Sequence, residues 1–152
     1  MGIPVIYIVV RFRPGHPEVS SRNRMMSAVK SMGAFLEGSE DVSIHPKVAP
    51  TDMDIIITKK RVGAFYNTEL ETVLRSLERT NLILLGLSTS GVVLSTIRWA
   101  IDADYTVTVV EDCCSDPDPE VHRVLTQKVF VRQATVVSSN DAIEGISKAT
   151  GI

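Results

Sequence analysis

The sequence predicts an α/β fold with three layers, in which helices cover both faces of a mostly parallel sheet of about five strands. Two observations support this fold class. Short, continuous apolar runs recur along the chain, as in strands buried on both faces, and amphipathic helical patterns separate them. Strands that alternate with helices are joined by crossover connections, which produce parallel pairing. Because no repeat or long linker interrupts this order, we expect one domain over residues 1–152.

The predicted strands are residues 5–10, 54–58, 82–85, 106–110 and 134–137, each of about strand length and rich in Val, Ile, Leu or Thr. Helical periodicity predicts helices over 22–36, 68–77, 92–103 and 120–130. A last helix over 140–148 is expected to begin with Ser139 or Asn140 as its cap. Proline-containing stretches at 14–18 and 38–54 are predicted to be loops.

Composition and charge exclude several classes of function. The net charge is −2, and the Lys and Arg residues are scattered, so we expect neither nucleic acid nor an anionic membrane as a partner. The longest apolar runs are about a third of the roughly 20 residues that a membrane helix needs. The first residues lack the positive region and cleavage site of a signal peptide, so a cytoplasmic location is expected.

Cysteine and histidine usage indicates neither a disulfide framework nor a metal site. Cys113 and Cys114 are adjacent and cannot join distant segments, so reduced thiols are expected. His16, His45 and His122 show no metal-ligand spacing. We therefore expect no metal and no other cofactor.

The carboxyl ends of the predicted strands are the places to look for chemistry, because ligands of open parallel sheets bind beyond those ends. Residues 11–13, 58–61, 86–91 and 111–114 follow four of the strands. The segment 86–91 is a Gly- and Ser-rich turn into a helix, whose backbone amides could hold an anion or a developing oxyanion. A plain helix cap is the alternative interpretation of this turn.

Several motifs resemble those of one known family. Residues 58–65, Thr-Lys-Lys-Arg-Val-Gly-Ala-Phe, resemble the segment of isochorismatase-like cysteine hydrolases in which a lysine ends a strand and a small-Ala-Phe pattern opens a helix. Residues 86–96, Gly-Leu-Ser-Thr-Ser-Gly-Val-Val-Leu-Ser-Thr, resemble the nucleophile loop of that family, and 99–112 are similar to the segment that follows it. Motifs in the same order along nearly the whole chain are more specific than any one of them. The resemblance implies a Rossmann-like, isochorismatase-like fold, a hydrolase ancestry and a homo-oligomer.

The catalytic residues of that family are an aspartate, a lysine and a cysteine. Only one of the three has a counterpart in this sequence. Lys59 matches the lysine. Val92 occupies the cysteine position and has no nucleophilic atom, so a thiolate mechanism cannot run through it. Ser90 and Ser95 are expected to point elsewhere and have no evident base. The family's aspartate ends a first strand that we expect to be missing here, which would leave two neighbouring strands without a hydrogen-bond partner.

The resemblance also implies a remnant pocket for a small carboxylate or carbonyl compound. Its expected members, besides a non-proline cis peptide bond at Gly91–Val92, are Phe12, Lys59, Arg61, Phe65, Ser90 and Gly91.

Three functions follow as hypotheses. The first is a pseudoenzyme, a non-catalytic domain that binds a small ligand or a partner. The second is an enzyme of altered chemistry, which uses Lys59 and the loop amides for hydrolysis, isomerisation or cyclisation. The third is a purely structural interaction protein, which would have no pocket.

Overall fold

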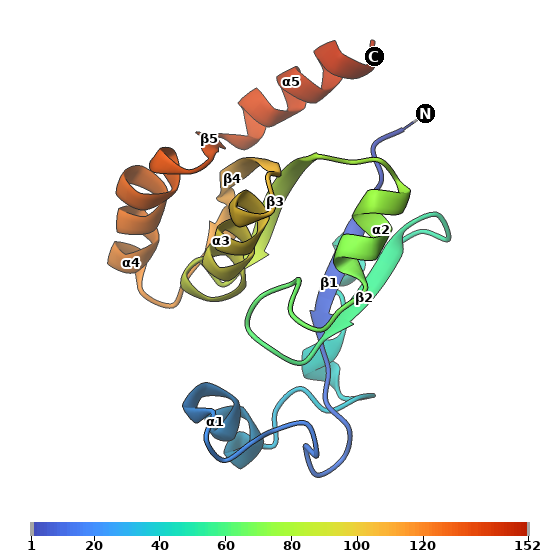
Figure 1. Ribbon diagram of the computed structural model, residues 1–152, viewed down its shortest axis with the longest axis vertical. Coiled ribbons are helices and arrows are strands. Elements are labelled where there is room, and N and C mark those ends of the chain that lie inside the picture. Colours follow the sequence, from blue (N-terminus) through green and yellow to red (C-terminus); the bar gives the residue numbers. More distant parts are fainter. Residues whose placement is uncertain (1, 152) are drawn as a thin grey trace. The chain divides into compact units, whose positions relative to one another are not determined.

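The computed structural model describes residues 2–151, which fold into two compact units (Figure 1). The first unit comprises residues 1–61 and 66–69, and the second comprises 62–65 and 70–152. Each is described by itself below.

The first unit is built on two parallel strands, β1 (Ile6–Val10) and β2 (Ile55–Lys59). Helix α1 (Arg24–Met32) begins at Asn23, whose side chain accepts a hydrogen bond from the backbone N–H of Met26. It ends at Gly33, which has a left-handed φ of 62°. The helix predicted over 22–36 is therefore shorter at both ends, since a left-handed residue satisfies the last carbonyls and turns the chain away. Two short 3₁₀ turns follow, η1 (Glu40–Val42) and η2 (Pro46–Val48).

The second unit is a parallel sheet with helices around it. Its strands are β3 (Asn81–Leu87), β4 (Thr106–Ser115) and β5 (Thr135–Val137), in the order β3-β4-β5. Figure 1 shows α3 lying along the sheet and α5 extending away from β5. The helical segments are α2 (Leu70–Ser76), η3 (Thr89–Val93), α3 (Leu94–Asp102), α4 (Pro119–Val124), η4 (Leu125–Val129), η5 (Phe130–Arg132) and α5 (Ser139–Thr150).

The core of the second unit joins α3 to the sheet and to the segment 62–65. Ile97, Val109 and Phe130 are wholly buried. The backbone N–H of Ala64 donates to Thr96 Oγ1 at 3.3 Å. Phe65 stacks on Trp99 with ring centroids 4.0 Å apart and an interplanar angle of 11°, an arrangement that adds to the burial of both rings.

The predicted fold class is confirmed, with one correction to the sheet. All five predicted strands form, and every pair is parallel. They form one sheet of two strands and one of three instead of a single sheet of five.

Two element boundaries also differ from the prediction, each for a local reason. Strand β4 continues to Ser115 because its pairing with β3 breaks after Val109 and resumes at Cys114. Helix α5 begins at Ser139, and its cap is Ser138, not Ser139 or Asn140, because Ser138 and Asp141 form a reciprocal capping box.

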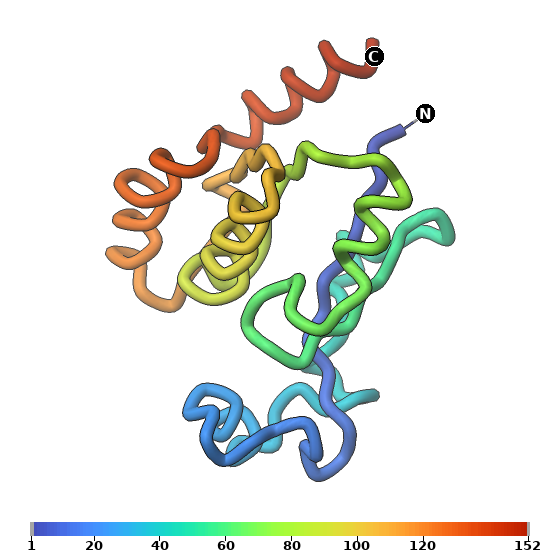
Figure 2. The backbone as a smooth tube through the Cα atoms, in the orientation of Figure 1, coloured from blue at the N-terminus to red at the C-terminus, as the bar shows by residue number. Residues whose placement is uncertain are grey.

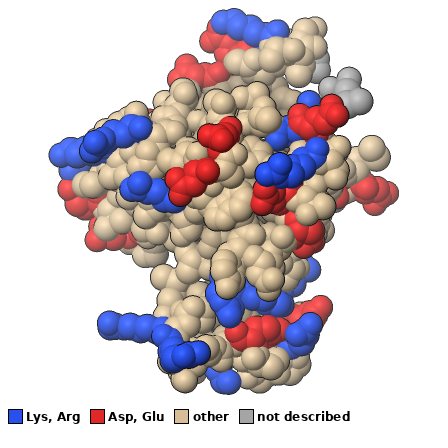
Figure 3. All heavy atoms as spheres, viewed as in Figure 1, with Lys and Arg blue, Asp and Glu red and all other residues tan. Residues whose placement is uncertain are grey.

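No helix in the described part of the chain is long and apolar enough to cross a membrane. On the face shown in Figure 3, Lys and Arg side chains are interspersed with Asp and Glu side chains. The cytoplasmic location and the lack of nucleic-acid partners stay predictions.

We predict that Ile97→Ala lowers the free energy of unfolding by about 2–5 kcal/mol, because it leaves a cavity beside a wholly buried position. The matched variant Ile143→Ala, at a 62% exposed position of α5, is expected to change it by less than about 0.5 kcal/mol. Urea denaturation followed by circular dichroism measures both. Equal effects of the two variants would contradict this assignment of the core.

Candidate functional site

The candidate site in the second unit is the turn between β3 and α3, which Figure 2 traces as one continuous coil. The turn is a single π-helical segment, η3, in which Gly91 and Val93 donate their backbone N–H groups to Ser88 O, each at 3.2 Å. The structure has a cis peptide bond at Leu87–Ser88, not at Gly91–Val92 as expected. The expected position was wrong because Gly91 and Val92 lie inside the helical turn, where peptide bonds are trans.

The backbone amide of Ser90, which we expected to be available to an anionic ligand, already has a partner within the protein. It donates to Asp116 Oδ2 at 2.7 Å. Hydrogen bonds from the Ser90 side chain and backbone lower the pKa of the Asp116 carboxyl group below its ordinary value. Asp116 was not among the predicted site residues, because the apolar run of this strand ends at residue 110 and only 111–114 were expected at its carboxyl end. Asp116 lies one residue beyond the true end of β4.

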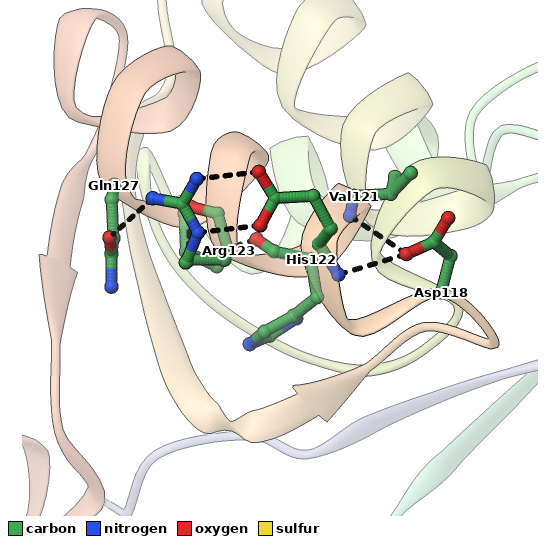
Figure 4. A network of polar contacts seen from close by, with 7 residues as sticks. Asp118, Val121, His122, Arg123 and Gln127 are labelled. Carbon is green, nitrogen blue, oxygen red and sulfur yellow. Dashed lines mark hydrogen bonds and ion pairs between the residues drawn. The ribbon is translucent and has the colours of Figure 1, made fainter.

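A second contact reaches the turn from α4. Thr89 is wholly buried, and its Oγ1 lies 2.8 Å from Nδ1 of His122. Helix α4 is fixed at its start by Asp118, whose carboxylate accepts from the backbone N–H groups of Glu120 and Val121, as Figure 4 shows. No sequence pattern indicated this contact of His122, since two residues 33 positions apart leave no local signal.

Three residues of the turn carry hydroxyl groups, namely Ser88, which is half-buried, Thr89 and Ser90. Neither Thr89 nor Ser90 is an exposed nucleophile beside a strong base. Thr89 has a histidine next to it, yet its side chain has no accessible surface. Ser90 is exposed, but its neighbour Asp116 has a lowered pKa and is a correspondingly weak base. Val92, half-buried in the same turn, carries only methyl groups.

The two thiols lie on β4, away from the turn in sequence. Both are free, with Cys113 exposed and Cys114 buried. Burial raises the pKa of the Cys114 thiol, so the nucleophilic thiolate is disfavoured. No group of three or more His, Cys, Asp or Glu side chains within residues 2–151 is arranged to hold a metal ion.

Lys59, at the end of β2 in the first unit, is the most perturbed of the predicted site residues. Its Nζ donates to the carbonyl of Arg61 at 2.8 Å, and no described carboxylate forms an ion pair with it. Burial lowers the pKa of its ammonium to about 8. The side chain can therefore act as a cation or as a neutral amine near physiological pH.

The other predicted members of the pocket are held by the fold in different ways. Arg61 donates through Nη1 to Lys60 O at 2.7 Å and through Nη2 to Glu18 O at 3.1 Å, so backbone carbonyls fix its guanidinium. Phe12 is wholly buried in the first unit, and Phe65 is buried against Trp99 in the second. The structure thus brings Ser90, Gly91 and Val92 together within η3, and it makes both phenylalanines part of the core.

Two hollows of the second unit, of about 390 and 540 Å³, lie at the amino ends of its strands. Thr80 and Tyr105, which directly precede β3 and β4, line the first, whereas Thr106 and Thr135, the first residues of β4 and β5, line the second. None of the predicted site residues lines either hollow.

Comparison with known proteins identifies the family. Residues 1–141 match the Isochorismatase domain, and the chain belongs to the isochorismatase family. It is 30% identical over 147 residues to ureidoacrylate amidohydrolase RutB of Agrobacterium fabrum, covering 89% of this chain and 60% of that protein. A cysteine hydrolase of Pseudomonas syringae pv. phaseolicola has the same fold, with a TM-score of 0.87 and 23% identity over 97% of this chain and 73% of that one. N-carbamoylsarcosine amidase of Thermoplasma acidophilum matches with a TM-score of 0.69 and 26% identity over 91% and 73%.

The chain spans 55–60% of the length of the curated relatives that it matches. The family and the α/β fold with parallel sheets are therefore established, whereas the activity and ligand are matters for proposal.

We predict that Thr89→Val lowers the free energy of unfolding by about 1 kcal/mol, because it removes the hydroxyl that contacts His122 while keeping the side-chain volume. Thr106→Val, which makes the same change at an exposed strand position, is the control and is expected to have a smaller effect. Chemical denaturation of both variants measures their free energies of unfolding. An unchanged Thr89→Val protein would show that the contact contributes nothing to stability.

A pH dependence follows from the lowered pKa of Lys59. Between about pH 8 and pH 10.5 the unfolded chain binds more protons at this site than the folded protein, so stability should rise with pH in that window. Relative to Lys59→Met, the wild-type protein should therefore gain unfolding free energy as the pH rises through this range. Urea denaturation at several pH values measures the difference, with Lys148→Met on α5 as the control. A difference between wild type and Lys59→Met that falls with pH would contradict the burial of a charged Lys59.

Proposed function

We propose that this protein is an isochorismatase-family domain that does not perform cysteine-dependent hydrolysis and instead binds a small carbonyl or carboxylate compound. The observation that carries the proposal is Val92, which stands in the strand-to-helix turn at the position that the resemblance assigns to the cysteine. Without a thiol or hydroxyl there, no acyl-enzyme or thioester can form through that residue.

The neighbouring groups support the absence of a substitute nucleophile. Thr89 is buried, Ser90 is bound to a weakly basic carboxylate, and Cys114 is buried with a raised pKa. Removing the nucleophile from an enzyme of this logic typically costs about a millionfold in rate. Any residual hydrolysis should accordingly be close to the background rate.

Ligand binding is proposed on the properties of Lys59. An ammonium that is largely removed from water and lacks a carboxylate partner among residues 2–151 interacts strongly with an incoming carboxylate or polarised carbonyl. Arg61, Ser90 and Gly91 are further candidate contacts on the resemblance alone. Phe12 and Phe65, which are buried, would support the fold around such contacts.

Ureidoacrylate, the compound named in a relative's activity, carries both a carbonyl and a carboxylate and is a suitable probe. We expect isothermal titration calorimetry to show binding of ureidoacrylate to the wild-type protein. The affinity should fall about tenfold or more in Lys59→Ala, because a hydrogen bond to a charged group contributes about 1.5–3 kcal/mol. Lys148→Ala, which removes an exposed lysine of α5, should bind as the wild type does.

The same samples test for hydrolysis. Nuclear magnetic resonance of ureidoacrylate incubated with the protein should show no turnover above the buffer control. Turnover that persists in a Cys113→Ser/Cys114→Ser variant and disappears in Ser90→Ala would contradict the proposal, because it would identify a working nucleophile in the turn.

An enzyme of altered chemistry is the second candidate, and the lowered pKa of Lys59 favours it. A lysine with a pKa of about 8 is partly neutral at pH 8 and can accept a proton. Under this alternative, activity on an amide or vinyl ether would be lost in Lys59→Ala, kept in Ser90→Ala, and would rise with pH through about 8. Activity that is independent of Lys59 would exclude it.

A further inference from the structure

Lys59 and Lys60 are neighbours at the carboxyl end of β2, both half-buried, but their ammonium groups have different surroundings. Lys60 Nζ donates to the carbonyl of Arg11 and lies 3.9 Å from Glu18 Oε1. Lys59 Nζ donates to the carbonyl of Arg61 at 2.8 Å, and no carboxylate among the described residues pairs with it. A carboxylate partner would favour the protonated form of the amine. Of the two lysines, Lys59 is therefore the one whose proton is held less firmly.

A neutral lysine is a nucleophile, because its nitrogen then carries a free electron pair. Burial lowers the pKa of Lys59 to about 8. Near pH 7 about a tenth of such side chains are neutral, compared with fewer than about one in a thousand for a lysine with the ordinary pKa of about 10.4. Lysines that are removed from water in this way form Schiff bases with carbonyl compounds. The chemistry open to Lys59 thus includes attack on the carbonyl carbon of an aldehyde or ketone.

The guanidinium of Arg61 belongs to the same short segment and is held in place. Its Nη1 donates to Lys60 O at 2.7 Å and its Nη2 donates to Glu18 O at 3.1 Å. Both acceptors are neutral carbonyls, so the positive charge is not neutralised by these bonds, and a guanidinium has more N–H groups than the two used here. A carboxylate is the anion that matches those N–H groups in geometry. A 2-oxo acid, which has a ketone beside a carboxylate, therefore carries one group for Lys59 and one for Arg61.

We propose that Lys59 forms an imine with a small 2-oxo acid whose carboxylate binds Arg61. The proposal rests on the proposed function, in which Lys59 contacts the ligand, and it specifies the class of that ligand. In the reaction, Nζ forms a bond to the ketone carbon, and the C=O π bond breaks as the oxygen takes up a proton from the nitrogen. Loss of the resulting hydroxyl group with the second amine proton, as water, leaves the C=N bond. Amine and ketone thus give imine and water, and the step needs no oxidant or reductant.

The first experiment traps the imine. The protein is incubated at the same pH with pyruvate and sodium cyanoborohydride, which adds hydride to the imine carbon and leaves a stable secondary amine. Cleavage after acidic residues keeps Lys59 and Lys60 in one peptide, whose fragment ions distinguish the two in a mass spectrometer. We expect Lys59 to be modified at least about tenfold faster than Lys60 or Lys148, an exposed lysine of α5. Equal rates at all three lysines, or no adduct on Lys59, would overturn the proposal.

The second experiment tests Arg61 by comparing two ketones. Acetone lacks the carboxylate of pyruvate, so the ratio of the trapping rates of pyruvate and acetone at Lys59 reports on carboxylate binding. Arg61→Met should lower this ratio at least about tenfold, as expected for the loss of a hydrogen bond between charged groups. Arg24→Met, which removes an exposed arginine of α1, is the matched control and should keep the ratio. An unchanged ratio in Arg61→Met would overturn binding of the carboxylate by Arg61.

The variant Lys59→Arg separates this proposal from the proposed function. Its guanidinium keeps the positive charge but stays protonated, so the variant should give no adduct at residue 59 while calorimetry still detects pyruvate. In the wild type, calorimetric binding of pyruvate without a trapped adduct would overturn the imine and leave the proposed function standing. Ureidoacrylate tests the proposed function independently, because its urea carbonyl does not form an imine. Absence of binding of both compounds would overturn the proposed function, and this proposal with it.

Discussion

The register between β3 and β4 is the constraint on which the rest of the second unit depends. Pairing runs to Leu84 and Val109, breaks, and resumes at Gly86 and Cys114. This irregularity carries β4 on to Ser115, next to the end of β3. Asp116 then reaches the backbone amide of Ser90, and α4 begins where its histidine meets Thr89. If β4 ended at residue 110 with regular pairing, neither the contact of Asp116 with Ser90 nor that of His122 with Thr89 would form.

The consequence for chemistry is that Asp116 and His122 of the same unit already bind polar groups of the turn. In many proteins the start of a helix after a parallel strand offers free amides to an anion. Here one of those amides is already paired with a carboxylate of the same chain, and the buried hydroxyl is paired with an imidazole. Lys59 in the first unit has the opposite character, since its ammonium is desolvated and paired only with a carbonyl. Lys59 is therefore a better candidate than the turn for binding a ligand or taking part in a reaction.

Local sequence predicted the strands well because each is a short run of apolar and β-branched residues between turn signals. The prediction of 5–10 became Ile6–Val10, and 54–58 became Ile55–Lys59. It failed where backbone geometry overrides side-chain pattern, as at Gly33, which ends α1 by adopting a left-handed conformation. It also failed at the sheet, because an apolar run says that a strand is buried but not which strand it pairs with. The motif at 86–91 located the turn correctly, but Asp116 and His122 were missed.

By itself, the sequence determined the order of strands and helices and the fact that residue 92 carries no thiol, because these are properties of periodicity and covalent structure. Its motifs also carried the resemblance to the family. Only the tertiary structure decided that Thr89 is inaccessible, that Asp116 occupies an amide of the turn and that Lys59 is desolvated. The physical reason is that burial and hydrogen bonding join residues far apart in the chain. The path of the backbone between them sets those contacts, and no local pattern records it.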